Sequence, residues 1–420
     1  MIASPVIAQD SAGRQPITLD TAARLETAAV LIVGAEAIPD LAFSPDGLLA
    51  AGGPDGVLYI WDTVTGARLA ALPDSSDETL PEVTSLAYRP DGALLAAGDA
   101  GGAIQLWDPA TGEALAALAA GEGAVTALAF DAAGTLLAAA PEDGGVQVWD
   151  PATGDEIATL GESAGAVNGL AFLSGGAALA AGGADGAIWL WDAPTGEARQ
   201  LAGEGSAVLQ LAASPDGAIL AALRDDGTIQ LWDVASEEVR AVLEPAEAGE
   251  FTSAAFVPGG ALVAAGTDAG SLMLWDVESG EMIVALHGHD GAVTSLDVSA
   301  GGDLIATGGA DREIRLWVVP PEEGSAGTGD PAAGAALFVE VGCAECHASE
   351  PDAPSIGPAL DVMAREAGAR LPGLTAQEYL ELSITQPHTT IVNGFPTLMP
   401  EFDLTGEEVS DLIAYIQTFR

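Results

Sequence analysis

Seven tryptophans recur at nearly constant spacing through the first three quarters of this 420-residue chain. The spacings are 46, 42, 42, 41, 43 and 42 residues, between Trp61, Trp107, Trp149, Trp191, Trp232, Trp275 and Trp317. A repeated unit of this length cannot bury a core of its own, so successive units must pack against one another. The repeat therefore limits this part of the chain to a stacked or ring-shaped array.

Within each unit, apolar runs of strand length are separated by turn-forming residues. In the first unit, runs between residues 41 and 61 are separated by Ser-Pro-Asp-Gly at 44–47 and Asp-Gly at 55–56. Pro and Gly favour the backbone angles of such turns. A further run follows each Trp, and six of the seven Trp are followed by Asp. This pattern resembles the WD-repeat family, and over residues 25–318 the resemblance implies an all-β, seven-bladed propeller.

The two ends of the array predict how the ring closes. The last unit stops after three strands, because Trp317 is followed by Val-Val-Pro-Pro, and a spare apolar run, Leu25–Val33, precedes the first unit. We expect this run to supply the missing outer strand of the last blade, which would leave no open sheet edge. The WD-repeat family often carries a His–Ser/Thr–Asp–Trp network within a blade, and here only the last blade has every member. These members are His289, Thr307, Asp311 and Trp317.

His287 and His289 also share a strand face beside Asp290, which is compatible with a metal site. Two His at positions i and i+2 are a weak pattern for metal ligands, however. We therefore favour a structural role for both.

A second domain follows a short linker, residues 319–332, in which Pro, Gly and Ser interrupt the repeat. The chain's only cysteines then occur together, in Cys343-Ala-Glu-Cys346-His347. Cys-x-x-Cys-His is the attachment pattern of c-type haem: each thiol can form a thioether, and the adjacent His can bind the iron. A redox Cys pair and a zinc site are the alternatives. The region lacks the βαβ pattern typical of the first and the additional ligands that the second requires.

Residues 333–420 resemble class I cytochromes c, most closely the cytochrome domains appended to some respiratory oxidase subunits. The residues that carry the resemblance, besides the attachment pattern, are Gly334 to Val341, Gly357-Pro358-Ala-Leu360, Gly394-Phe395, Met399-Pro400 and the closing run 404–416. The resemblance implies an all-α domain with one covalently bound haem c. It implies attachment at Cys343 and Cys346, and His347 and Met399 as the axial ligands of the iron.

The same resemblance assigns the rest of the cofactor-binding residues, namely Pro358, Leu360, Arg370 and Phe395. The Pro358 carbonyl would accept the Nδ1 proton of His347 and so orient the ligand. Arg370 would lie near the haem propionates.

Met363 and His388 are the alternative sixth ligands. Met363 falls on an expected helix and His388 in an expected loop, so we favour Met399. A His/Met pair leaves no open coordination position and so favours electron transfer over ligand activation.

The predicted organisation is thus multidomain: an N-terminal segment at 1–24, the propeller at 25–318, the linker at 319–332 and an all-α class I cytochrome c domain at 333–420.

Charge limits the partners of this chain. There are 62 Asp and Glu against 12 basic residues, all of them Arg, and the net charge is −50. This composition excludes ordinary nucleic-acid binding, which needs a basic patch, and it disfavours docking on anionic lipid, because there is no polybasic segment. The excess is spread evenly over the two domains, which favours adaptation to high salt over a local acidic docking patch. No transmembrane segment is predicted, because the longest charge-free stretch, Ser163–Ala184, alternates like strands and contains six Gly.

Residues 1–8, Met-Ile-Ala-Ser-Pro-Val-Ile-Ala, resemble the end of a secretory signal peptide but lack its charged start and full apolar stretch. They are either a truncated signal or an ordinary terminus. Cytochrome c maturation takes place outside the cytoplasmic membrane, which favours the signal and a periplasmic or extracellular location.

We therefore expect an exported electron carrier that has a redox protein partner and a propeller that binds protein. The alternative is an oxidoreductase with a catalytic site in the propeller funnel and the cytochrome as relay. It is disfavoured because the propeller has no Cys or Lys and only two His, His287 and His289. A haem-based sensor would require a displaceable ligand in place of Met399.

Overall fold

The computed structural model describes residues 14–33, 37–73, 81–160, 166–173, 178–192, 197–202, 205–246, 249–320, 331–340 and 406–417, with Cys343, Leu380 and Ile384. The chain divides into two compact units, Met1–Pro320 and Pro321–Arg420. Each unit is described by itself.

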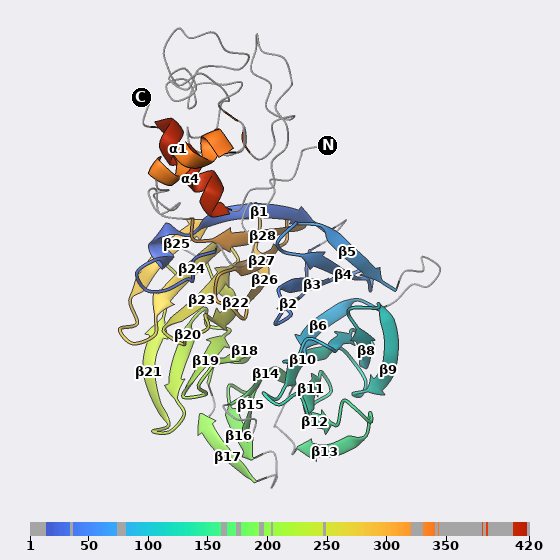
Figure 1. Cartoon of the computed structure of the whole chain (residues 1–420). Coiled ribbons are helices and arrows are strands. Elements are labelled where there is room, and N and C mark those ends of the chain that lie inside the picture. The colour runs from blue at the N-terminus through green and yellow to red at the C-terminus, as the bar shows by residue number, and fades with distance from the viewer. Residues whose placement is uncertain are drawn as a thin grey trace. The chain divides into compact units, whose positions relative to one another are not determined.

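The first unit is a ring of seven four-stranded sheets, the blades, numbered here in chain order of their first strands (Figure 1). Blade 1 is β2 (Leu41–Phe43), β3 (Leu48–Gly52), β4 (Leu58–Asp62) and β5 (Arg68–Leu72); blade 2 is β6 (Val83–Tyr88), β7 (Leu95–Asp99), β8 (Ala103–Asp108) and β9 (Glu113–Ala119); blade 3 is β10 (Val125–Phe130), β11 (Leu137–Pro141), β12 (Val146–Trp149) and β13 (Glu156–Leu160); blade 4 is β14 (Val167–Phe172), β15 (Ala178–Gly183), β16 (Ile188–Asp192) and β17 (Ala198–Ala202). Blade 5 is β18 (Val208–Ala213), β19 (Ile219–Arg224), β20 (Ile229–Asp233) and β21 (Glu238–Leu243); blade 6 is β22 (Phe251–Phe256), β23 (Leu262–Thr267), β24 (Ser271–Asp276) and β25 (Met282–His287); blade 7 is β26 (Val293–Val298), β27 (Ile305–Gly309), β28 (Glu313–Val318) and β1 (Glu26–Ile32). The prediction of a seven-bladed propeller is confirmed.

Each of the seven repeated tryptophans lies on the third strand of its blade. In blade 1, Trp61 pairs with Leu49 of the second strand, and the same register recurs in blade 2, where Trp107 pairs with Leu95. Packing between blades explains why the second strands are so rich in alanine. Ala50, Ala96 and Ala138, for example, are fully buried. Small side chains at these positions let neighbouring sheets approach closely enough to fill the space between them.

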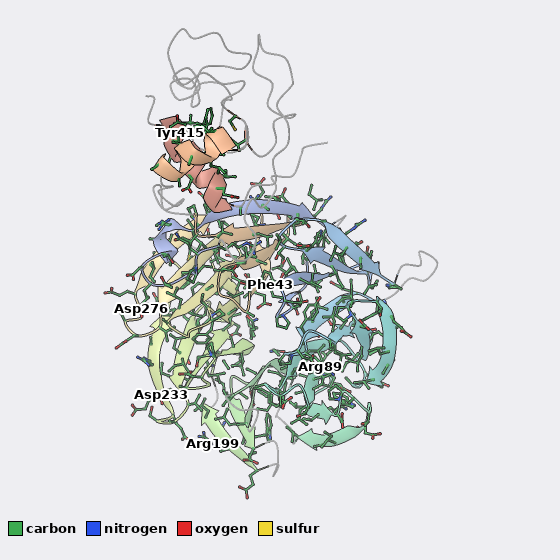
Figure 2. The ribbon with its side chains drawn as sticks, viewed as in Figure 1. Phe43, Arg89, Arg199, Asp233, Asp276 and Tyr415 are labelled. Atoms are coloured by element: carbon green, nitrogen blue, oxygen red, sulfur yellow. The ribbon has the colours of Figure 1, made fainter. Side chains whose placement is uncertain are left out.

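The Asp that follows the repeated Trp shapes the turn into the fourth strand. The Oδ1 atom of Asp233 accepts hydrogen bonds from the backbone N–H groups of Ala235 and Ser236, at 3.1 and 2.8 Å. Asp276 makes the same pair of bonds in the next blade, and both turns lie on the outside of the ring (Figure 2). Such a side chain satisfies backbone donors that the turn would otherwise leave open. The backbone bonds from Ser236 also lower the pKa of Asp233.

The ring closes through a strand from the beginning of the chain. Strand β1 pairs antiparallel with β28, from Glu26 opposite Val318 to Ile32 opposite Glu313. The outer strand of blade 7 is therefore supplied by the run that precedes the first repeat, as the sequence predicts. The charge-free stretch Ser163–Ala184 likewise contributes strands, β14 and β15.

In the second unit the structure describes two helices, α1 (Pro331–Glu340) and α4 (Gly406–Gln417), and a helical conformation at Leu380 and Ile384. The prediction that the whole domain is all-α extends beyond these residues and stays a prediction. Among the described helices of either unit, none is long and apolar enough to cross a membrane.

Candidate functional site

The second unit is organised around the packing of α1 against α4. Phe338 of α1 and Leu412 and Ile413 of α4 are each less than 5% exposed, in a cluster that also contains Leu380 and Ile384. The ring of Phe338 lies 5.5 Å from the ring of Tyr415, centroid to centroid. On α4 the buried residues recur at spacings of three and four, which places them on one face of the helix. These buried residues of α4 are Val409, Leu412, Ile413 and Ile416.

Glycine is required where the two helices cross. A Cβ atom at Gly334 of α1 would overlap the backbone carbonyl of Asp411 in α4 and approach the Cβ of Tyr415. Without a side chain at this position the two backbones can meet directly, which no other residue would allow.

Cys343 follows α1 after two residues and packs half-buried against the same apolar cluster. Helix α1 thus delivers a thiol to the edge of the core. The alternative ligands Met363 and His388 lie outside the described residues. So do the other predicted site residues, which are Cys346, His347, Pro358, Leu360, Arg370, Phe395 and Met399.

The described part of this unit fits a covalently held haem. A haem is a large and mostly apolar group, and a thioether at Cys343 would attach it beside this apolar cluster. In sequence, the first thiol is followed by a second thiol and a His, which is the donor set that haem c requires.

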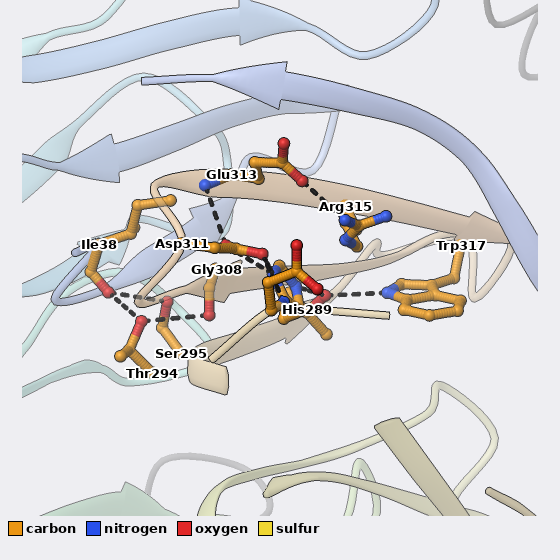
Figure 3. A network of polar contacts seen from close by, with 11 residues as sticks. Ile38, His289, Thr294, Ser295, Gly308, Asp311, Glu313, Arg315 and Trp317 are labelled. Carbon is orange, nitrogen blue, oxygen red and sulfur yellow. Dashed lines mark hydrogen bonds and ion pairs between the residues drawn. The ribbon is translucent and has the colours of Figure 1, made fainter. Parts of the chain in front are cut away.

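In the propeller, the predicted four-residue network is present in blade 7 (Figure 3). His289 Nδ1 lies 2.9 Å from Asp311 Oδ1, and His289 Nε2 lies 2.8 Å from Thr307 Oγ1. Trp317 Nε1 donates a hydrogen bond to the same Thr307 hydroxyl at 2.9 Å. The pattern is consistent if His289 donates from Nδ1, and Thr307 donates to Nε2 while it accepts from Trp317.

Burial keeps this network neutral at the imidazole. It lowers the pKa of His289, against the opposing effect of Asp311. Burial would also raise the pKa of Asp311, but the hydrogen bonds from His289 and from the backbone N–H of Asp290 outweigh it and lower that pKa.

The geometry assigns His287 and His289 to different environments. Both ring nitrogens of His289 are occupied by Asp311 and Thr307. His287 is exposed on the outer strand β25 and lies 3.5 Å from the Ser271 hydroxyl. Among the described residues no group of three or more His, Cys, Asp or Glu is placed to hold a metal ion. A structural role for His289 therefore replaces the metal alternative.

Sequence reasoning missed two carboxylates that join first strands of adjacent blades. Asp297 of β26 accepts a hydrogen bond from the backbone N–H of Phe43 in blade 1, at 2.7 Å. Asp40, just before β2, accepts one from the N–H of Leu86 in blade 2, also at 2.7 Å. Phe43 lies near the middle of the ring (Figure 2). A signal for Asp297 was present, because the other six blades carry Ala at its repeat position.

These two carboxylates are costly to ionise. Burial raises the pKa of Asp40 to about 7, and the nearby charge of Asp297 adds to the rise. The hydrogen bonds from the backbone N–H groups of Leu86 and Leu41 oppose it. Burial likewise raises the pKa of Asp297 to about 6. Each oxygen of both groups nevertheless has a backbone donor, since Leu41 and Val298 bond the two remaining oxygens. The arrangement holds three neighbouring blades together at the centre of the ring.

A buried arginine makes a similar bridge further round the ring. Arg224, at the end of β19, is 4% exposed, and its Nη1 atom donates to the backbone carbonyls of Ser206 and Gly186. Burial lowers the pKa of Arg224. Its contacts are with the backbone of blade 4 and of the segment leading into blade 5, so it acts as a structural cation.

Comparison with known families agrees with both units. The model described as WD domain, G-beta repeat matches residues 31–62, 74–108, 112–150, 154–192, 197–233 and 280–318. Blade 6 forms in the structure although its first three strands, β22 to β24, lie outside these matches. The model described as Cytochrome c matches residues 331–420. A comparison with curated proteins found no match.

The repeat model covers more than half of the chain, and its matched segments end on the third strands of blades whose fold is described above. The chain therefore belongs to the WD-repeat family, as a seven-bladed propeller fused to a cytochrome c domain.

Proposed function

We propose that this chain is an exported electron-transfer protein in which one covalently bound haem c is carried on a propeller that binds a protein partner. The observation that carries the proposal is the position of Cys343. Cys343 lies shortly after α1 and packs against the apolar cluster, and Cys346 and His347 follow three and four residues later in sequence. The cytochrome c family match over this region supports the same assignment.

Haem c, when bound, supplies a one-electron iron couple. In the proposal, Cys343 and Cys346 would hold the group through thioethers, and His347 and Met399 would be the protein ligands of the iron. The Pro358 carbonyl would accept a hydrogen bond from the Nδ1–H of His347, which would fix the orientation of the imidazole and raise its basicity. Leu360, Phe395 and Arg370 complete the surroundings of the group.

The choice of ligands decides between electron transfer and other haem functions. A neutral thioether opposite His favours the reduced state and so raises the potential. If His347 and Met399 both bind the iron, no coordination position would be left for a substrate or a gas. We therefore favour a carrier over a sensor.

The propeller supplies the docking function in this proposal. Propellers of the WD-repeat family commonly act as platforms for other proteins, and this is an argument from fold. The two propeller histidines do not support the oxidoreductase alternative. His289 is hydrogen-bonded to Asp311 and Thr307 within blade 7, and His287 is exposed on the outer strand β25. The proposed location outside the cytoplasmic membrane is supported by the site of haem c attachment in cells and by the resemblance of residues 1–8 to a signal peptide.

A redox titration of the full chain tests the ligand assignment, with Met399→Ala as the variant and Met363→Ala as the matched control. Met399→Ala should lower the midpoint potential and abolish the Met–iron charge-transfer band. The reduced variant should bind carbon monoxide, because a coordination position is open. Met363→Ala should keep the potential and the band of the wild type. If the two variants exchange these behaviours, Met363 is the ligand, and if the wild type binds carbon monoxide, the carrier assignment is wrong.

A further inference from the structure

The segment before β1, residues 14–25, contacts three blades and includes a buried charge. Arg14 has a side chain that is 3% exposed. Its Nη2 atom donates to the backbone carbonyl of Thr63 in the turn after β4 of blade 1, at 2.8 Å. Its Nη1 atom lies 3.7 Å from Asp303, in the turn between β26 and β27 of blade 7. One guanidinium therefore spans the junction between the last blade and the first.

The middle of the segment is buried against blades 6 and 7. Ile17 is 3% exposed, and its backbone N–H donates to the carbonyl of Gly302 in blade 7 at 2.8 Å. Ile17, Ala22 and Leu25 belong to one apolar cluster with Leu262 of blade 6 and other residues of both blades. The short 3-10 helix η1 (Ala22–Arg24) lies against β25, the outer strand of blade 6. This burial is the main favourable term for holding the segment in place.

The same segment also binds the two residues that follow β28, where the chain leaves blade 7. Gln15 forms an isolated antiparallel bridge with Val319, directly after β28. The Nη2 atom of Arg24 donates to the carbonyl of Pro320 at 2.5 Å. Val319 itself is 1% exposed, in the cluster that contains Ile17. The last two residues of the first unit are thus bound to its first described residues.

We propose that residues 14–25 form a clasp that locks the composite blade 7 and fixes the point at which the linker to the cytochrome domain begins. Blade 7 is assembled from strands that lie at opposite ends of the repeat, so β1 and β28 are joined only by sheet hydrogen bonds. The clasp adds an ion pair, buried apolar contacts and a backbone bridge beyond the end of that pairing. Because Val319 and Pro320 are held, the tether of the second unit starts at a fixed place on the propeller instead of fraying back along β28.

Hydrogen–deuterium exchange of the full-length protein tests the clasp at the backbone that it holds. The variants are Arg14→Gln and Ile17→Ser, with Arg89→Gln as matched control, because Arg89 pairs only with its neighbour Asp91 in the described structure. Exchange in a peptide over 313–320 should rise about tenfold in both clasp variants, since local opening no longer breaks the clasp contacts. Exchange in blade 3, over 125–149, should stay within about twofold of the wild type, as should both peptides in the control.

A pair of deletions gives an independent measurement. Removal of residues 2–20 should produce the same local loss of protection over 313–320, whereas removal of residues 2–13, which leaves the clasp intact, should not. Unchanged exchange over 313–320 in the point variants and the longer deletion would overturn the proposal. An equal rise over blade 3 would overturn it as well, because it would show that the segment contributes only to global stability.

Discussion

The Thr307 hydroxyl links two buried ring nitrogens in blade 7, Nε2 of His289 and Nε1 of Trp317. Thr307 is fully buried, so no water can replace its hydroxyl without a rearrangement of the blade. The other blades carry Ala at this repeat position, as with Ala265 in blade 6, so they lack this network. Blade 7 has the additional task of joining strands from the two ends of the repeat.

Thr307→Ala should therefore cost about 2 kcal/mol of unfolding free energy, because it leaves a buried donor and a buried acceptor without a partner. Chemical denaturation followed by tryptophan fluorescence would measure the change. Thr65→Ala, at an exposed turn position, serves as the control and should change the free energy by less than about 0.5 kcal/mol. A Thr307→Ala variant as stable as the control would show that the network contributes nothing to ring closure.

At the scale of the strand, Asp40 and Asp297 make the propeller sensitive to pH. Their pKa values in the folded state, about 7 and about 6, lie above the ordinary value of 3.8 for Asp. A folded state that binds protons more tightly than the unfolded state gains stability as the pH falls. That gain begins as the pH falls through the folded-state pKa values and is complete near 3.8.

The free energy of unfolding should thus be higher at about pH 5 than at about pH 8. We expect this pair to contribute about 2 kcal/mol, which is less than the full pKa shifts would give, because both residues are partly exposed to solvent. A double variant, Asp40→Asn with Asp297→Asn, should lose this part of the pH dependence, as seen by denaturation at both pH values. Asp108→Asn is the control. Backbone hydrogen bonds from Thr111 and Ala110 lower the pKa of Asp108 from its ordinary value, so this group does not titrate between about pH 5 and about pH 8. An identical pH dependence in the wild type and the double variant would refute this role.

The repeat made the elements of the propeller predictable, and departures from the repeat marked what was missed. The spacing of Trp61 through Trp317 indicated seven blades, and the truncated last unit indicated that Leu25–Val33 would close the ring. The clasp at residues 14–25 has no periodic pattern, since its partners are turns and backbone carbonyls of three blades. Asp40 and Asp297 were missed because a carboxylate in or directly before an apolar strand gains its donor from the next blade only once adjacent blades are assembled. In the cytochrome domain, the helix at α4 and the place of Cys343 after α1 follow from the sequence, while the haem-binding roles of all the predicted site residues, Cys343 included, stay predictions.

At the scale of the whole molecule, the net charge of −50 is the dominant property. Many Asp residues are held by backbone donors in turns, and Asp62 and Asp108 are two of them. These local bonds do not remove the repulsion between the charges of separate blades, which acts over longer distances. Salt at about 1 M shortens the screening distance to roughly 3 Å and would weaken that repulsion.

The melting temperature should therefore rise with salt concentration, and sodium chloride and potassium chloride should act alike because the effect is one of screening. Differential scanning calorimetry from about 0.05 M to about 2 M salt would follow it. A melting temperature that does not change over this range would contradict adaptation of the chain to a salty environment.

The central claim is that this propeller carries one haem c, attached at Cys343 and Cys346. Intact-protein mass spectrometry under denaturing conditions, with a pyridine haemochrome spectrum of the same sample, tests it most directly. After expression with a cytochrome c maturation system, the chain should carry the mass of one haem and show the spectrum of a haem with both vinyl groups attached. The Cys343→Ser, Cys346→Ser double variant should carry none. A wild-type chain that emerges at its apoprotein mass under the same conditions would contradict the account.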